Sequence, residues 1–143
     1  MVKEIIDDGK QNLAIQSNYP FRIACENGCI EIVALLLKCK AVNPADSDGD
    51  AFVNACSHGH LEIVKMLLQD GRINPGAPNN QGLSFACKYG HEKVVELLLE
   101  DVRIDPSMAS EILKITPKTP QYTRIRSMMT LAVSRHLSYR PIL

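Results

Sequence analysis

The side chains with the greatest chemical potential in this chain are cysteines and histidines that recur at a fixed spacing. Cys25, Cys56 and Cys87 follow one another at intervals of 31 residues, and His60 and His91 stand 31 residues apart. Thiolate and imidazole groups are the usual zinc ligands, paired thiols can form disulfides, and histidine is the commonest acid–base group. These residue types could therefore support metal binding, cross-linking or catalysis.

The spacing argues against all three. Equivalent cysteines on successive packed helices stand about 8–10 Å apart, whereas a disulfide needs Cα atoms within about 7 Å. Cys25 and Cys29 with His58 and His60 could be imagined as a zinc site, but Gly28 interrupts the cysteine pair and the histidine spacing matches no common zinc pattern. We predict small, buried, reduced thiols, no metal ligands and no cofactor.

Acidic residues and short motifs add no catalytic centre. Asp46, Asp48 and Asp50 form an acidic group in an expected turn, and no twelve-residue calcium loop with a closing glutamate surrounds them. The chain has no glycine-rich phosphate loop, no Gly-x-Ser-x-Gly elbow and no His-Glu-x-x-His helix. We therefore predict a protein that is not an enzyme and has no catalytic residues.

The elements that position these side chains are short helices in a repeated pair. Apolar spacing predicts a first helix over 20–27 and a second over 30–38, with Gly28 between them. An Asn-Pro or Asp-Pro step then ends each unit, because the residue before proline disfavours the helical conformation. The residues that recur at intervals of 31 include Val33, Val64 and Val95, and Leu36-Leu37, Leu67-Leu68 and Leu98-Leu99. Such short helices need stacked neighbours to be stable.

The second helices carry a family resemblance. The segments 59–68, Gly-His-Leu-Glu-Ile-Val-Lys-Met-Leu-Leu, and 90–99, Gly-His-Glu-Lys-Val-Val-Glu-Leu-Leu-Leu, resemble the second-helix signature of ankyrin repeats. The resemblance covers residues 1 to about 106, although the family's Thr-Pro-Leu-His start is missing and each unit is about two residues short. It implies an all-α solenoid of stacked helix-turn-helix repeats, in which His60 and His91 tie neighbouring loops together by hydrogen bonds.

The register divides the chain into a partial repeat over 1–17, repeats over 18–48, 49–79 and 80–106, and a C-terminal region over 107–143. Beyond Pro106 we expect the period to fail, with a short helix over 108–115 and a longer one over 121–137. An apolar stripe on the longer helix favours a cap over the last repeat. The stripe consists of Ile125, Met128, Met129, Ala132, Val133 and Leu137.

The resemblance implies a function in binding another protein through the concave side of the array, near the ends of the first helices and at the tips of the links. Tyr89 is the expected anchor, because an exposed tyrosine offers a large contact area at small entropic cost. The predicted partner-binding residues are Glu26, Asn27, Ser57, His58, Lys88, Tyr89, Asp46, Asp48, Ala77 and Asn79.

Charge leaves an alternative open. Residues 1–106 carry a net charge of −5 and residues 107–143 a net charge of +5. The basic C-terminal helices could recruit a second partner, such as ubiquitin-ligase machinery, or contact an anionic surface, which would make the protein an adaptor. Nucleic acid and membrane have little support as partners, and no small-molecule substrate is indicated.

Composition bears on location and assembly. No apolar run is long enough to cross a bilayer, no secretory signal is visible, and the five cysteines are odd in number, so we expect a cytoplasmic or nuclear protein. Val2, Ile5 and Ile6 in the partial repeat leave open a monomer or an end-to-end homodimer.

Overall fold

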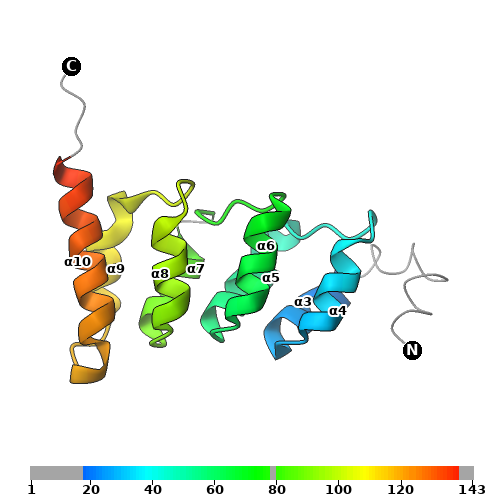
Figure 1. The fold of residues 1–143 in the computed structure, drawn as a ribbon, viewed down its shortest axis with the longest axis horizontal. Coiled ribbons are helices and arrows are strands. Elements are labelled where there is room, and N and C mark those ends of the chain that lie inside the picture. The colour runs from blue at the N-terminus through cyan, green and yellow to red at the C-terminus, as the bar shows by residue number, and fades with distance from the viewer. Residues whose placement is uncertain (1–17, 78–79, 139–143) are drawn as a thin grey trace, which may run out of the picture.

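Residues 18–77 and 80–138 are described by the computed structural model, and they form helices in four successive pairs. The second helices of the pairs stand side by side in front of the first helices, and the links between pairs run along one edge (Figure 1). The expected all-α solenoid with a helical C-terminal cap is confirmed. The helices are α3 (Tyr19–Asn27), α4 (Ile30–Leu37), α5 (Asp46–Ser57), α6 (Leu61–Asp70), α7 (Gln81–Lys88), α8 (Glu92–Glu100), α9 (Ala109–Ile115) and α10 (Thr123–Ser138), with short 3₁₀ turns η1 (Pro106–Met108) and η2 (Pro120–Tyr122).

One apolar core runs through the whole stack. Each internal pair contributes small buried residues from its first helix and branched residues from its second, as Ala86 and Cys87 in α7 and Val95 and Leu98 in α8 illustrate. Burial of each leucine or valine side chain contributes roughly 1.5–3 kcal/mol, so contact between neighbouring pairs supplies most of the stability.

Two of the first helices, α3 and α7, begin at asparagines in the left-handed conformation. Asn18 and Asn80 cap α3 and α7 with φ of 54° and 55°, a conformation that asparagine tolerates better than most residues. Both side chains are buried. Asn18 Oδ1 accepts a hydrogen bond from the backbone N–H of Asn43, and Asn80 Nδ2 donates one to the carbonyl of Asp105. These asparagines therefore fix each helix start to the link that follows the pair.

The start of α5 differs from the expected turn. Asp46 and Asp48 lie in the first turn of this helix and not in a free link. Ser47 and Gly49 have φ of 54° and 79°, so the first turn is irregular, as its Asp, Ser and Gly composition favours. Asp46 accepts a hydrogen bond from Asn18 Nδ2 at 3.0 Å, which ties this first turn to the start of α3.

The C-terminal region regains the period, contrary to expectation. Tyr122, Ile125 and Met129 follow His91, Val94 and Leu98 at a spacing of 31, and α10 packs against α8 as α8 packs against α6. The register is lost only in α9, whose buried residues follow those of α7 at a spacing of 26. Because α9 departs by five residues from the period of 31, a fixed spacing does not reveal the fourth pair.

The outer face of α10 closes the stack. Arg126 stands where α6 and α8 have Val64 and Val95, and the exposed Thr130 follows Leu99 at the repeat spacing. Arg126 donates to the carbonyls of Leu113 and Thr116 at the end of α9. A polar outer face is what the terminal unit of an array requires, since no further unit covers it.

Two expectations lie outside the described residues, namely the partial repeat over 1–17 and the pairing of its apolar residues with another copy. In the part of the chain that is described, no helix is long and apolar enough to cross a membrane.

Candidate functional site

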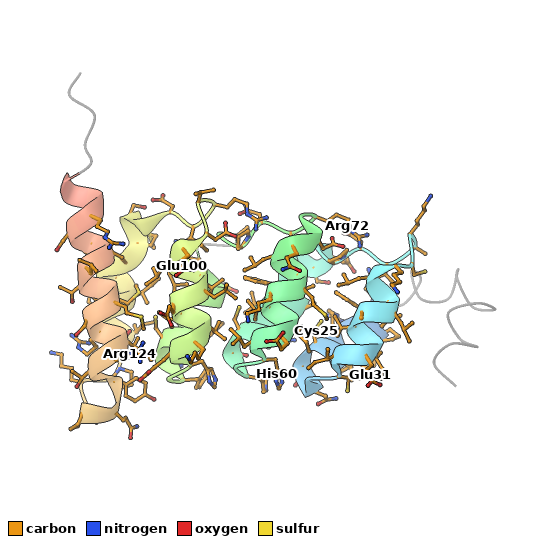
Figure 2. All side chains as sticks on the ribbon, viewed as in Figure 1. Cys25, Glu31, His60, Arg72, Glu100 and Arg124 are labelled. Carbon is orange, nitrogen blue, oxygen red and sulfur yellow. The ribbon has the colours of Figure 1, made fainter. Side chains whose placement is uncertain are left out.

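The turn edge of the array is held by a ladder of hydrogen bonds between neighbouring pairs. His60 Nε2 bonds to the carbonyl of Glu26 at 2.8 Å, and His91 Nε2 bonds to the carbonyl of Ser57 at 2.8 Å. The role that the family resemblance implied for these histidines is confirmed. Figure 2 shows His60 at this edge, beside the end of α3.

Tyr122 continues the ladder into the fourth pair. It stands 31 residues after His91, and its hydroxyl donates to the carbonyl of Lys88 at 3.3 Å. Its ring also covers Gly90, as the histidine rings cover Gly28 and Gly59. The spacing was visible in the sequence, but the change from histidine to tyrosine concealed it.

A second ladder, which the sequence reasoning missed, holds the link edge. Arg72 donates to the carbonyls of Leu37 and Val42 in the preceding unit at 2.9 and 3.1 Å, and it pairs with Asp70. Arg103 repeats the arrangement with Leu68, Ile73 and Asp101. The signal was an Asp-x-Arg step that recurs at a spacing of 31. Figure 2 shows Arg72 at the edge opposite His60.

Each arginine of this second ladder also perturbs its carboxylate. The hydrogen bond from Arg72 holds the pKa of Asp70 below its usual value, and Arg103 does the same to the pKa of Asp101. Charge-assisted hydrogen bonds favour the ionised carboxylate and lower its pKa. This effect is larger than that of partial burial, which raises the pKa. The carboxyl groups of Asp70 and Asp101 at the link edge are therefore ionised at neutral pH.

Six of the predicted partner-binding residues lie together where the first helices end. Asn27, His58, Lys88 and Tyr89 are exposed, while Glu26 and Ser57 are half-buried. The carbonyls of Glu26, Ser57 and Lys88 accept the ladder bonds, so these residues combine a structural backbone with a free or partly free side chain.

The structure does not bring the predicted link residues to the same place. Asp46 is the first residue of α5 and Ser57 the last, so the two sets of residues lie at opposite ends of the first helices. Ala77 is half-buried in the following link. The side chain of Asp48 and all of Asn79 lie outside the described residues. The predicted residues at the ends of the first helices therefore form one surface, whereas the predicted link residues do not belong to it.

His58 is held in a fixed orientation at the centre of this surface. Its Nδ1 lies 2.9 Å from the carbonyl of Asn54 and 3.2 Å from the hydroxyl of Ser57. Its ring stacks on that of His60, with centroids 5.9 Å apart and planes inclined by 7°. A side chain positioned in this way loses little freedom when a partner binds.

The end of α7 carries an aromatic and cationic group. Tyr89 is 52% exposed and stacks on Phe85, whose ring centroid lies 6.1 Å away. The ammonium group of Lys88 lies 5.5 Å from the Tyr89 ring centroid, within the range of a cation–π interaction. Phe85 was not among the predicted residues, although its spacing of four from Tyr89 places both on one helix face.

A second aromatic group on α3 was also missed. The Arg22 guanidinium lies 6.0 Å from the centroid of Tyr19 and pairs with Asp50 of α5 at 3.3 Å. Tyr19 is 53% exposed. The signal was again helical spacing, because Tyr19 and Arg22 are three residues apart.

The repeated cysteines lie in the core, as predicted. Cys25, Cys56 and Cys87 are fully buried, and none of the five cysteines forms a disulfide in the structure. Burial raises the pKa of Cys25 to about 12, and it raises that of Cys87 to about 12 against a hydrogen bond with Thr116. These thiols are protonated and inert at neutral pH. Among the described residues, no group of three His, Cys, Asp or Glu side chains could hold a metal ion.

Comparison with known proteins agrees with this architecture. The family model of ankyrin repeats, with three copies, matches residues 1–79 and 21–110. The comparison with curated proteins found no match, and the comparison with solved structures found none either. The matched residues make up more than half of the chain, and they include the turn glycines and ladder histidines described above. The chain therefore belongs to the ankyrin repeat family.

Proposed function

We propose that the protein is a non-enzymatic module that binds another protein through the exposed side chains at the ends of its first helices. Ankyrin repeats are in general protein–protein interaction modules. The observation that carries the proposal for this chain is the contrast at one repeat position. Asn27, His58 and Tyr89 differ in chemistry and are exposed, while each is followed by a glycine and, in the second and third repeats, by a ladder histidine.

A rigid scaffold supports this function. The two ladders tie each helix pair to the pair before it, so the exposed ends of the first helices form a surface with little freedom to lose on binding. Tyr89 and His58 are stacked on neighbouring rings and are already oriented. Aromatic residues held in this way are enriched among the side chains that dominate binding energy.

The test is affinity capture from the native cell with the wild-type chain and a double variant, His58→Ala with Tyr89→Ala. The matched control is Glu62→Ala with Lys93→Ala, two exposed residues of the second helices. We expect the first variant to lose the captured partner and the control to keep it, with the Tm of both within a few degrees of the wild type. Equal capture by both variants would exclude this surface.

The adaptor alternative has less support. The apolar stripe of the basic C-terminal region is used for packing, since Ile125 and Met129 of α10 are fully buried. Of the basic residues in this region, Arg126 bonds to carbonyls of α9 and Arg124 lies 3.9 Å from Glu92. Arg140 lies outside the described residues. The burial of Ile125 and Met129 favours the cap over the adaptor.

A further inference from the structure

We propose that the partner presents an acidic segment with apolar side chains, and that this segment lies across the ends of α7 and α9. The proposal rests on the proposed function and narrows it to one part of the surface and one chemistry of partner. We call this part the α7–α9 patch and define it by Lys88, Tyr89, Lys114 and Ile115.

The four residues occupy equivalent positions at the ends of two neighbouring helices. At the end of α7, Lys88 and Tyr89 follow the buried Ala86 by two and three residues. In α9, Lys114 and Ile115 follow the buried Ile112 by the same two and three residues. Three residues before Ala86 lies the buried Leu83 of α7, and three residues before Ile112 lies the buried Ala109 of α9. The two helices thus present a lysine and a large apolar residue at equivalent places.

The ends of the two helices meet. α9 packs against α7, and both Cys87, which directly precedes Lys88, and Thr116, which directly follows Ile115, are buried at these helix ends. The hydroxyl of Tyr122 reaches the carbonyl of Lys88 from the turn that follows α9. These contacts hold the α7–α9 patch together across the boundary between the third and fourth pairs.

The charge of the patch selects an acidic partner. No carboxylate among the described residues forms an ion pair with Lys88, nor with the exposed Lys118 in the adjoining turn. Lys114 does pair with Glu111, but both side chains are more than half exposed, and such a pair is worth little in water. The ammonium groups of Lys88, Lys114 and Lys118 are therefore available to a carboxylate of the partner.

The apolar side chains distinguish a protein segment from a nucleic acid. Tyr89 and Ile115 are each 52% exposed, and an aliphatic side chain such as Ile115 gains nothing from a phosphate backbone. The guanidinium of Arg126 is already bonded to the carbonyls of Leu113 and Thr116 at the end of α9. A protein segment that carries both carboxylates and apolar side chains therefore fits the two lysines and two apolar residues of the patch better than a nucleic acid does.

The experiment is a selection of random linear peptides displayed on phage against the full chain. We expect enriched peptides to combine Asp or Glu with aromatic or aliphatic residues and to bind less tightly as salt rises. Lys88→Glu with Lys114→Glu, and separately Tyr89→Ser with Ile115→Ser, should each weaken the binding of a synthetic enriched peptide roughly tenfold or more. Lys93→Glu is the matched control, since Lys93 is an exposed lysine of α8 outside the patch.

The outcomes separate this inference from the proposed function. Peptides that lose binding on His58→Ala but not on the patch variants would overturn the inference and leave a protein-binding surface elsewhere. Enriched peptides without acidic residues, or no enrichment at all, would also overturn it. So would a fluorescent single-stranded RNA that binds the wild type more tightly than the enriched peptides do. Far-UV circular dichroism melts show whether each variant is folded.

Discussion

The histidine ladder can be tested by two glycine substitutions that differ in one respect. Gly59 and Gly71 both adopt the left-handed conformation, with φ of 72° and 83°. A Cβ at Gly59 would lie 2.8 Å from Cε1 of His91, whereas a Cβ at Gly71 would meet nothing within 4 Å. Gly59→Ala therefore strains the backbone and displaces His91, while Gly71→Ala only strains the backbone.

The magnitudes follow from these contacts. The left-handed conformation costs an alanine roughly 1–2 kcal/mol at either position. Displacement of His91 breaks its 2.8 Å bond to the carbonyl of Ser57, and a partly buried carbonyl without a partner costs about 1–3 kcal/mol more. We expect Gly59→Ala to lower the free energy of unfolding by about 2–5 kcal/mol and Gly71→Ala to lower it by about 1–2 kcal/mol.

Urea denaturation measures both values, provided that circular dichroism and tyrosine fluorescence give coincident transitions. A double-mutant cycle with His91→Ala isolates the ladder, because in that background Gly59→Ala should cost no more than Gly71→Ala does. If Gly59→Ala is no more destabilising than Gly71→Ala in the wild-type background, the ladder bond does not stabilise the array.

Two further predictions concern ionisable groups. Since Arg103 lowers the folded-state pKa of Asp101, this pair stabilises the fold above the ordinary aspartate pKa of about 4, and the stabilisation is lost as pH falls through the lowered pKa. Urea titrations from neutral to acidic pH should therefore show a steeper loss of stability for the wild type than for Asp101→Asn. A thiol reagent at neutral pH should modify the half-buried Cys29 and Cys39 in the folded protein. Three thiols should react only after unfolding, namely Cys25, Cys56 and Cys87; their rapid reaction in the native state would contradict the buried packing.

Much of the fold could be predicted from the period alone. The helices expected over 20–27 and 30–38 are α3 and α4 within a residue at each end, because glycine and proline steps mark helix ends locally. The buried cysteines followed from their place on the apolar stripe. The bonds of His60 and His91 followed from the family resemblance and not from spacing.

Other features could not be found in this way. The left-handed asparagine caps depend on partners such as Asn43, which is 25 residues from Asn18 in the chain. The fourth pair was hidden because α9 shifts the register by five residues before Tyr122 restores it. The arginine ladder is marked in the sequence by the recurring Asp-x-Arg step. Its partners could not be predicted, because they are backbone carbonyls of the preceding unit and do not depend on the type of side chain.

The candidate surface, too, was predicted from the sequence only in part. Sequence indicated that Tyr89 and His58 are exposed and variable, since those properties follow from position within one repeat. Only the tertiary structure placed Asp46 and Ser57 at opposite ends of α5 and packed α7 against α9. Periodicity and turn chemistry are local, so the sequence by itself determined the helices, their buried faces and the stacking. Which exposed side chains share a surface depends on how neighbouring units are offset, and packing between them decides that offset.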